Sequence, residues 1–301
     1  MTNNRPKMAG GRIRVVLGVG LTLAFLSQCR NLMSILDPPT RAPGFGATPA
    51  VAKLDTTAVA ADRQVENAIQ RMAREAPLDI LREAQRRYRE EVIDYTCTFQ
   101  KQENLGGKLT KVQTVDVKFR EKLQSVFMHW TKNPGKARRV IYVKDRWTKS
   151  GEPQALCEPE GAIARLVVRS ILRPIHGPDA KSASRRTIDQ FGFANALDLI
   201  IKYSMMAKEH DKLKLTCVGT GNVGGRPTYV YERTLPYTGE GGEWPDRVLV
   251  FHLDAETLLP LSCASYADDA KQQLLGKYEY TDVKLNVGLT EADFDGKTYG
   301  M

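Results

Sequence analysis

The feature that most constrains the fold is a run of strand-like segments at the C-terminal end of the chain. The segments are KLKLTCVGTG, TYVYERTLP, RVLVFHLD, LPLSCASY and LLGKYEYTDVKLNV, and the run closes with EADFD. In each segment apolar residues alternate with polar ones, and turn residues separate the segments. Alternation with a period of two is typical of an antiparallel sheet with one buried face and one wet face. The sequence therefore predicts a strand-rich meander.

A second group of strands is predicted nearer the N-terminus. DYTCTFQKQENL alternates in the same way, and Gly106-Gly107 turns it into KLTKVQTVDVKFRE. SVFMHWT and ARRVIYVKD follow, with Asn133-Pro134-Gly135 as the turn between them. This part of the chain predicts a further antiparallel meander.

Three stretches have the periodicity of amphipathic helices. Residues 62–76 form the first, which Pro77 ends, and residues 78–95 form the second. Residues 186–210 form the third, with a capping box predicted at Thr187 and Gln190. The segment GAIARLVVRSILR fits either a short helix or a buried strand. The order of helices, strands, helix and strands predicts an α+β domain, in which helices cover one side of a curved antiparallel sheet.

The N-terminus predicts export. MTNNRPKMAGGRIR is basic, and Val15 to Leu26 follow as twelve uncharged, mostly apolar residues. That length fits the apolar region of a signal peptide better than a full membrane span. Residues 26–29 (LSQC) are similar to a bacterial lipobox, in which Cys29 is the lipidation candidate, although Gln28 departs from that pattern. Lipidation, removal and an uncleaved membrane anchor stay open, and a buried core helix is a further alternative.

Composition divides the chain into three parts. Residues 1–30 are the predicted signal peptide or anchor. Residues 31–57 are rich in Pro, Ala, Gly and Thr without periodicity, which is typical of a flexible linker. Residues 58–301 are the predicted single domain. With 42% hydrophobic residues the chain can bury a sizeable core.

The net charge argues against a nucleic-acid-binding protein. The chain carries +9, but the first 28 residues hold four basic residues and no acidic one, so the rest holds 40 basic and 35 acidic residues. Short basic clusters are balanced by neighbouring acids, which is typical of a solvated face. This excess lacks the dense basic stripe of nucleic-acid binders, and no such motif is present.

Four further cysteines lie in the predicted domain: Cys97, Cys157, Cys217 and Cys263. Export permits disulfides, and four cysteines allow three pairings. Three of the four share a strand face with apolar residues, where a free cysteine behaves as a small hydrophobe. Buried thiols are therefore favoured, although the disulfide state stays open. No C-x-x-C pair is present, so a metal or redox site is not expected.

No catalytic or cofactor motif survives a test of its context. Residues 219–224 match G-x-G-x-x-G, but a strand follows where nucleotide binding needs a helix N-terminus, so a hairpin is predicted. His252 and Asp254 share a strand face, but no third metal ligand is near at useful spacing. We predict no catalytic residue, no metal and no cofactor. A hydrolase assembled from distant residues is the remaining enzymatic alternative.

Five aromatic residues are candidates for a ligand-binding cavity: Phe99, Phe119, Phe127, Trp130 and Phe251. They lie on strands whose faces alternate. In a flat sheet under helices these rings would be ordinary core. In a strongly curved, incompletely closed barrel, part of that face would line an apolar cavity that holds an acyl chain.

Several motifs resemble those of an uncharacterised bacterial family, DUF1571, which is similar in fold to the LolA/LolB-like lipoprotein-sorting proteins. They are DYTCTFQKQE, VKFRE followed by SVFMHWT, RRTIDQFGFANAL, D-x-x-T-x-x-P, YEYTDVKLNVGL and DFD, and the resemblance covers about residues 78–296. It implies a LolA-like half-barrel sheet around helices, with an apolar interior that takes lipid chains in characterised relatives. It carries over no catalytic residue.

These observations lead to three hypotheses. The first is a non-catalytic, exported and membrane-tethered protein of the periplasm or cell envelope that binds a lipid or a lipoprotein acyl chain. The second is a structural or protein-interaction module whose interior is filled by its own side chains. The third is an envelope hydrolase with a dispersed site. The identity of the ligand and the oligomeric state stay open.

Overall fold

The computed structural model describes residues 68–301, except for the side chains of residues 164–166. The predicted signal peptide or anchor, the lipidation candidate Cys29 and the predicted linker lie outside the described residues. So does the beginning of the first predicted helix. The described residues belong to one compact unit, Leu54–Met301.

The described chain begins with helical residues 68–75. The elements that follow are, in chain order, α2 (Pro77–Glu91), β1 (Asp94–Leu105), β2 (Lys108–Leu109), β3 (Gln113–Arg120), β4 (Ser125–Lys132), β5 (Ala137–Val143), β6 (Thr148–Lys149), β7 (Glu152–Pro159), α3 (Ala162–Val167), β8 (Ile171–Pro174), α4 (Pro178–Ala183), η1 (Ile188–Gln190), α5 (Phe193–Glu209), β9 (Lys214–Val223), β10 (Arg226–Thr234), β11 (Val248–Asp254), β12 (Pro260–Tyr266), β13 (Leu274–Leu285), η2 (Glu291–Phe294) and η3 (Gly296–Tyr299).

The strands form one antiparallel sheet built from the two predicted meanders. Its order is β6-β7-β5-β4-β3-β1-β13-β12-β11-β10-β9, with β2 on β1 and β8 on β7. The meanders meet where β1 pairs with β13, in a register that places Phe99 opposite Tyr280. The path ends at β6 and β9, so the sheet is not closed into a barrel. The predicted incomplete barrel is therefore confirmed.

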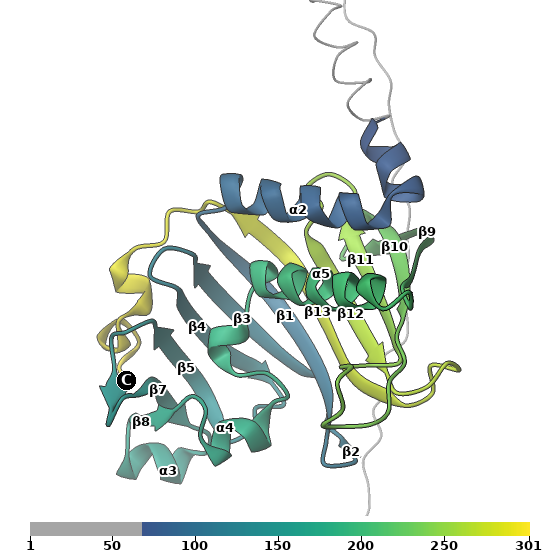
Figure 1. The fold of residues 1–301 in the computed structure, drawn as a ribbon. Coiled ribbons are helices and arrows are strands. Elements are labelled where there is room, and N and C mark those ends of the chain that lie inside the picture. The colour runs from purple at the N-terminus through teal and green to yellow at the C-terminus, as the bar shows by residue number, and fades with distance from the viewer. Residues whose placement is uncertain (1–67) are drawn as a thin grey trace, which may run out of the picture. The chain divides into compact units, whose positions relative to one another are not determined.

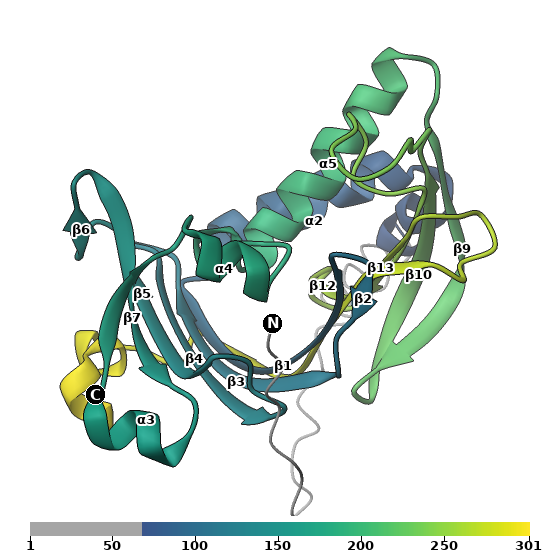
Figure 2. The same cartoon turned by 90° about the horizontal axis from the view of Figure 1, so that it is seen from below.

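The sheet curves around α4 and α5, as Figure 2 shows. We call this concave face of the sheet the inner face and the opposite one the outer face. Both α2 and α5 lie over the inner face (Figure 1). Helix α2 starts with Pro77 in its first turn and buries one stripe, and α5 buries another against the same core. The buried residues of the two helices are Ile80, Leu81, Ala84, Tyr88, Phe193, Leu197, Ile200, Ser204 and Ala207.

The third predicted helix is shorter than the periodicity indicates. Residues 188–190 form the separate 3₁₀ turn η1, and α5 begins at Phe193. The side chain of Thr187 makes no capping hydrogen bond, so the predicted capping box is wrong. Gly192 interrupts the helix because its φ of 118° lies outside the helical range. L side chains rarely adopt this φ, so the position favours glycine. A Cβ there would lie 2.9 Å from Cζ of Phe119.

Two other segments resolve differently from their sequence patterns. The ambiguous GAIARLVVRSILR contains both a helix, α3, and an exposed strand, β8. The closing EADFD is the 3₁₀ helix η2 and not a strand. Thr290 and Asp293 form a reciprocal capping box around its first turn, which fixes the local backbone as helical.

The outer face of the sheet has a small core of its own. Phe294 of η2 packs there against Phe127, Ile141 and Val143. The C-terminal segment therefore covers part of the face that an alternating sheet would leave wet. This is why apolar residues occur consecutively in β4 and β5.

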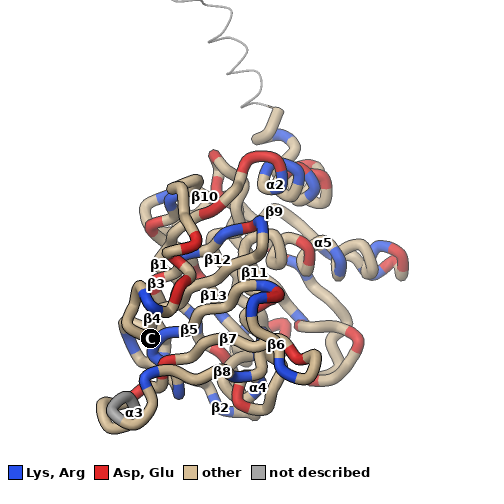
Figure 3. Tube along the Cα trace, turned by 90° about the vertical axis from the view of Figure 1, so that its left-hand side faces the viewer, with Lys and Arg blue, Asp and Glu red and all other residues tan. Residues whose placement is uncertain are grey.

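Charged residues of both signs are interspersed along the strands in the view of Figure 3. This agrees with the mixed charge pattern of the sequence.

None of the helices within residues 68–301 is long and apolar enough to cross a membrane.

Candidate ligand-binding cavity

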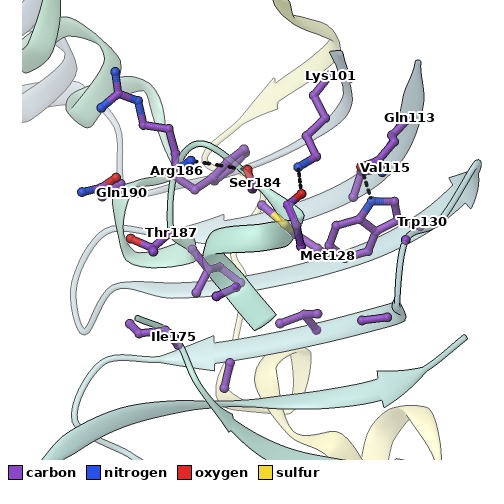
Figure 4. A pocket seen from close by; sticks show the side chains of 18 of the residues that line it. Lys101, Gln113, Val115, Met128, Trp130, Ile175, Ser184, Arg186, Thr187 and Gln190 are labelled. Atoms are coloured by element: carbon purple, nitrogen blue, oxygen red, sulfur yellow. Dashed lines mark hydrogen bonds between the residues drawn. The ribbon is translucent and has the colours of Figure 1, made fainter. Parts of the chain in front are cut away.

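A cavity of about 380 Å³ lies on the inner face of the sheet. We call it the large cavity. One wall is formed by strands β1, β3, β4, β5, β7, β12 and β13, and the other by β8, α4, the segment up to Gly192 and the beginning of α5. Figure 4 shows side chains from both walls. Most of its strand wall is apolar, with Phe99, Val115, Met128, Trp130, Val140 and Ala155 among the lining residues.

Two of the five aromatic candidates line the large cavity. Phe99 of β1 and Trp130 of β4 are on its wall. The Phe99 ring contacts that of Phe191, with centroids 5.1 Å apart, and that of Tyr280 at 4.8 Å. Trp130 donates its indole N–H to Oε1 of Gln113 at 3.0 Å. The hydrogen bond fixes the polar edge of the indole, while the ring lines the cavity.

The other three candidates lie elsewhere, and the predicted cavity set needs correction. Phe127 faces the outer side of the sheet, where its ring stacks on Tyr299 with centroids 4.1 Å apart. Phe119 and Phe251 are on the inner side, but their rings are packed within the hydrophobic core. The Phe119 ring stacks on Tyr95 at 4.9 Å, and the Phe251 ring on Tyr231 at 5.0 Å. Alternation did not identify the face of Phe127, and it could not identify which part of the inner face stays unfilled.

Sequence reasoning missed the aromatic residues that complete the wall. Phe191 comes from the segment before α5, and Tyr278 and Tyr280 come from β13. The spacing in KYEYTD places the two tyrosines on one face of their strand. That face is the inner one because β13 pairs with β1 and continues its curvature. The local pattern shows that the two tyrosines share a face. Which face this is depends on the pairing of β13 with β1, about 180 residues away in the sequence.

A buried carboxylate lies beside the wall. Glu103 is 1% exposed and accepts hydrogen bonds from Lys101 Nζ at 3.0 Å, from the Tyr278 hydroxyl at 2.8 Å and from Ser184 Oγ at 3.0 Å. Burial raises the pKa of Tyr278, and the neighbouring Glu103 carboxylate raises it further. The phenol therefore stays protonated and donates to the carboxylate. This network joins β1 and β13 to the segment that follows α4.

The rim of the large cavity includes the short helix α4. None of its residues is buried, yet Ala180 and Ala183 line the cavity. Lys136, from the loop before β5, lies 2.9 Å from the Asp179 carboxylate of α4. Both side chains are exposed, at 72% and 57%, so this contact holds α4 only weakly.

All four cysteines in the described part of the chain are free thiols. Cys157 and Cys263 line the large cavity, whereas Cys97 and Cys217 do not. Burial raises the pKa of Cys157 to about 11 and that of Cys263 to about 12. At neutral pH the two thiols are therefore protonated and act as part of the apolar wall.

The remaining sequence motifs are parts of the β9–β11 region. Gly219 and Gly221 lie within β9, and the turn at Gly224-Gly225 leads into β10, so no helix follows the glycines. His252 Nδ1 lies 3.0 Å from Thr228 Oγ1. The Asp254 carboxylate accepts from Arg226 Nε at 2.6 Å. Among residues 68–301, no group of three His, Cys, Asp or Glu side chains is placed to hold a metal ion.

Comparison with known proteins identifies a family and several distant structures. The model of the family described as "Protein of unknown function (DUF1571)" matches residues 92–299. No curated protein matches the chain. The chain is also distantly similar to several solved structures.

A DUF1329 family protein from Desulfovibrio piger is 15% identical with a TM-score of 0.36, over 74% of this chain and 98% of that one. MucB in the Pseudomonas aeruginosa MucA/MucB complex is 17% identical with a TM-score of 0.42, over 72% of this chain and 60% of that one. A LolA superfamily protein from Nitrosomonas europaea is 10% identical with a TM-score of 0.33, over 73% of this chain and 97% of that one.

Proposed function

We propose that this chain, which belongs to the DUF1571 family, binds an apolar ligand such as a lipid or a lipoprotein acyl chain in the large cavity. The observation that carries this proposal is an apolar cavity of about 380 Å³ between the sheet and the helices. Small-molecule sites commonly enclose about 300–1,000 Å³. An interior filled by its own side chains, as a purely structural module requires, would leave no such volume.

The walls suit an alkyl chain. Phe99, Val115, Met128 and Val140 present apolar surface from adjacent strands. Each methylene group that leaves water for such a surface contributes about 0.8 kcal/mol. A chain of ten methylene groups would therefore gain about 8 kcal/mol, which is comparable to the cost of about 4–15 kcal/mol for the freedom lost on binding.

We infer that the protein binds its ligand without transforming it. The catalytic base most common in enzymes is histidine, and none of the histidines within residues 68–301 lines the large cavity. The two thiols on the wall have raised pKa values, which disfavours a nucleophilic thiolate. Both observations favour a binding protein over the alternative of a dispersed hydrolase.

We also propose that the protein is exported and tethered in the cell envelope. The basic leader and the apolar run from Val15 to Leu26 support export. A carrier or sensor of lipid chains would meet its ligand at the membrane, so this location agrees with the cavity.

The test is binding of a neutral fluorescent probe, N-phenyl-1-naphthylamine, together with mass spectrometry of lipid extracted from the purified protein. Ala183→Trp should weaken probe binding at least ten-fold, because Ala183 is exposed on α4 and lines the cavity. Ser182→Trp is the matched control, since Ser182 is its exposed neighbour and does not line the cavity. No co-purified lipid and no probe binding to the unmodified protein would refute the proposal.

A further inference from the structure

A second, smaller cavity of about 110 Å³ adjoins the large one. It lies between α5 and the strands β10 to β13. The two cavities share part of their lining, namely Arg186, Ala196, Leu199, Cys263 and Tyr278. The two cavities are therefore neighbours along the same part of α5.

Charged residues make up a larger share of the lining of the small cavity than of the lining of the large one. Arg185, Arg186 and Arg233 line it, with Asp246 as the one acidic residue. Arg233 is 1% exposed, and its Nη2 lies 3.1 Å from both carboxylate oxygens of Asp246. That pair is neutral as a unit, so Arg185 and Arg186 leave the lining with an excess of positive charge.

Two of these guanidinium groups carry buried N–H groups that lack an acceptor. Within the described residues, Nη1 of Arg185 and Nε of Arg233 are buried and have no hydrogen-bond partner. The other contacts of Arg233 are its pair with Asp246 and a hydrogen bond from Nη1 to the Ile200 carbonyl at 3.2 Å. Buried donors are nearly always paired in folded proteins, and an orphaned one therefore points to a missing acceptor.

The buried carboxylate of Glu103, which contacts the backbone of Arg185, does not supply that acceptor. Glu103 accepts from the backbone N–H of Arg185 at 3.2 Å, but its charge is paired with Lys101 at 3.0 Å. Within residues 68–301 no ion pair joins Glu103 to the guanidinium of Arg185. The Arg185 side chain is thus available to an anion that enters from the cavity.

We propose that the small cavity binds the anionic headgroup of an amphiphile, a carboxylate or a phosphate, while the alkyl chain of the same molecule lies in the large cavity. This inference rests on the proposed function, since it requires a chain in the large cavity. Guanidinium groups recognise both headgroups through paired N–H donors. A cavity of this size holds several water-sized groups, so either headgroup fits.

The experiment compares three C16 compounds as competitors of the neutral probe on the full chain: palmitate, monohexadecyl phosphate and hexadecanol. Palmitate and hexadecyl phosphate should each displace the probe at a concentration at least ten-fold lower than hexadecanol. The stronger of the two identifies which headgroup the cavity prefers. Sodium acetate and inorganic phosphate, which have no chain, should displace nothing.

Arg185→Gln should reduce the advantage of the anionic compounds to less than about three-fold, because it removes the charge and the unpaired donor. It should leave hexadecanol unchanged. Arg186→Gln is a second variant, which removes an exposed charge from the shared wall with little risk to folding. Arg169→Gln is the matched control, since Arg169 is exposed and lines neither cavity.

The outcomes separate this inference from the proposed function. If hexadecanol competes as well as palmitate and hexadecyl phosphate, the headgroup site is refuted and the apolar cavity stands. If Arg185→Gln weakens hexadecanol as much as palmitate, the residue has only a structural role, and the inference is refuted. Binding of acetate or inorganic phosphate by itself would refute a site built for an amphiphile. If neither the probe nor any C16 compound binds, the proposed function itself fails.

Discussion

The Lys136 ammonium lies 2.9 Å from the Asp179 carboxylate, and this ion pair joins the loop before β5 to α4 at the rim of the large cavity. Because α4 buries none of its residues, it is held to the sheet by surface contacts such as this weak ion pair. We therefore expect α4 to control access to the cavity.

Asp179→Asn should speed ligand association by no more than about five-fold, because an exposed ion pair holds α4 only weakly. Stopped-flow fluorescence with the neutral probe measures this rate. The difference from the unmodified protein should shrink at 1 M salt, where exposed charges are screened. Glu232→Gln, which removes an exposed pair with Lys271 outside both cavities, is the control. Equal rates in the two variants would argue against a role for α4 in access.

Bound ligand should protect Cys157 and Cys263 from alkylation but leave Cys217 unaffected, because only the first two line the large cavity. Labelling of Cys263 should rise steeply with pH, since burial raises its pKa to about 12 and only the thiolate reacts. Mass spectrometry of the alkylated peptides, with and without ligand, gives the three rates. Uniform protection of all three thiols would point to a global change in the protein and not to occupancy of the cavity.

Phe127→Ala should destabilise the protein by about 3–5 kcal/mol without changing ligand affinity, because this buried ring packs on the outer face. Trp130→Ala should show the opposite pattern, with about three- to ten-fold weaker binding from the loss of an aromatic wall. Chemical denaturation and probe titration measure the two quantities. Weaker binding by Phe127→Ala, measured where this variant is folded, would place the ligand on the outer face of the sheet and contradict binding in the large cavity.

Asp254→Asn should lower the free energy of unfolding by about 1–3 kcal/mol at pH 7, since its 1%-exposed carboxylate accepts charged hydrogen bonds from Arg226. Burial acts to raise the pKa of Asp254, but hydrogen bonds from Arg226 and Thr257 outweigh it and lower the pKa below 3.8. A lowered pKa stabilises the fold above pH 3.8, and this contribution is lost as the pH falls through the pKa of the folded state.

The difference between the unmodified protein and Asp254→Asn should therefore narrow below pH 3.8. Urea denaturation at pH 7 and pH 3 tests this. Asp116→Asn, at an exposed position of β3, is the control and should change stability little at either pH. If the difference in stability between the unmodified protein and Asp254→Asn widens in acid, the lowered pKa of Asp254 is contradicted.

Gly192→Ala should destabilise the protein by about 1–3 kcal/mol, because the backbone conformation at Gly192 disfavours a side chain. The added Cβ would also meet the Phe119 ring at 2.9 Å. Gly135→Ala is the matched control, since its backbone is unstrained and the nearest atom to a Cβ is 3.9 Å away. Thermal unfolding compares the two. Equal Tm values would show that the start of α5 tolerates a side chain at Gly192.

The local pattern of the chain was sufficient for most elements of the fold. The segment DYTCTFQKQENL coincides with β1, and the five closing strands follow their predicted order. Alternation succeeds there because each strand lies between a packed face and a more open one. It failed for EADFD and at the start of α5, where a capping box and a glycine with positive φ decide the backbone over a few residues.

The site was less predictable, and β4 shows why. Val126, Phe127 and Met128 are all buried, so their apolar character does not tell the two faces apart. The C-terminal segment covers Phe127 from outside, and its own residues lie more than 160 positions further along the chain. No local pattern in β4 contains that contact.

The sequence by itself determined a curved antiparallel sheet with helices on one side, because period-two and helical patterns are local properties of the chain. Only the tertiary structure decided which part of the inner face is packed as core and which part lines the two cavities. That outcome depends on how far α4, α5 and the segment between them fill the concave side. It also brings Arg185 and Arg233 together from different elements, which no spacing in the chain reveals.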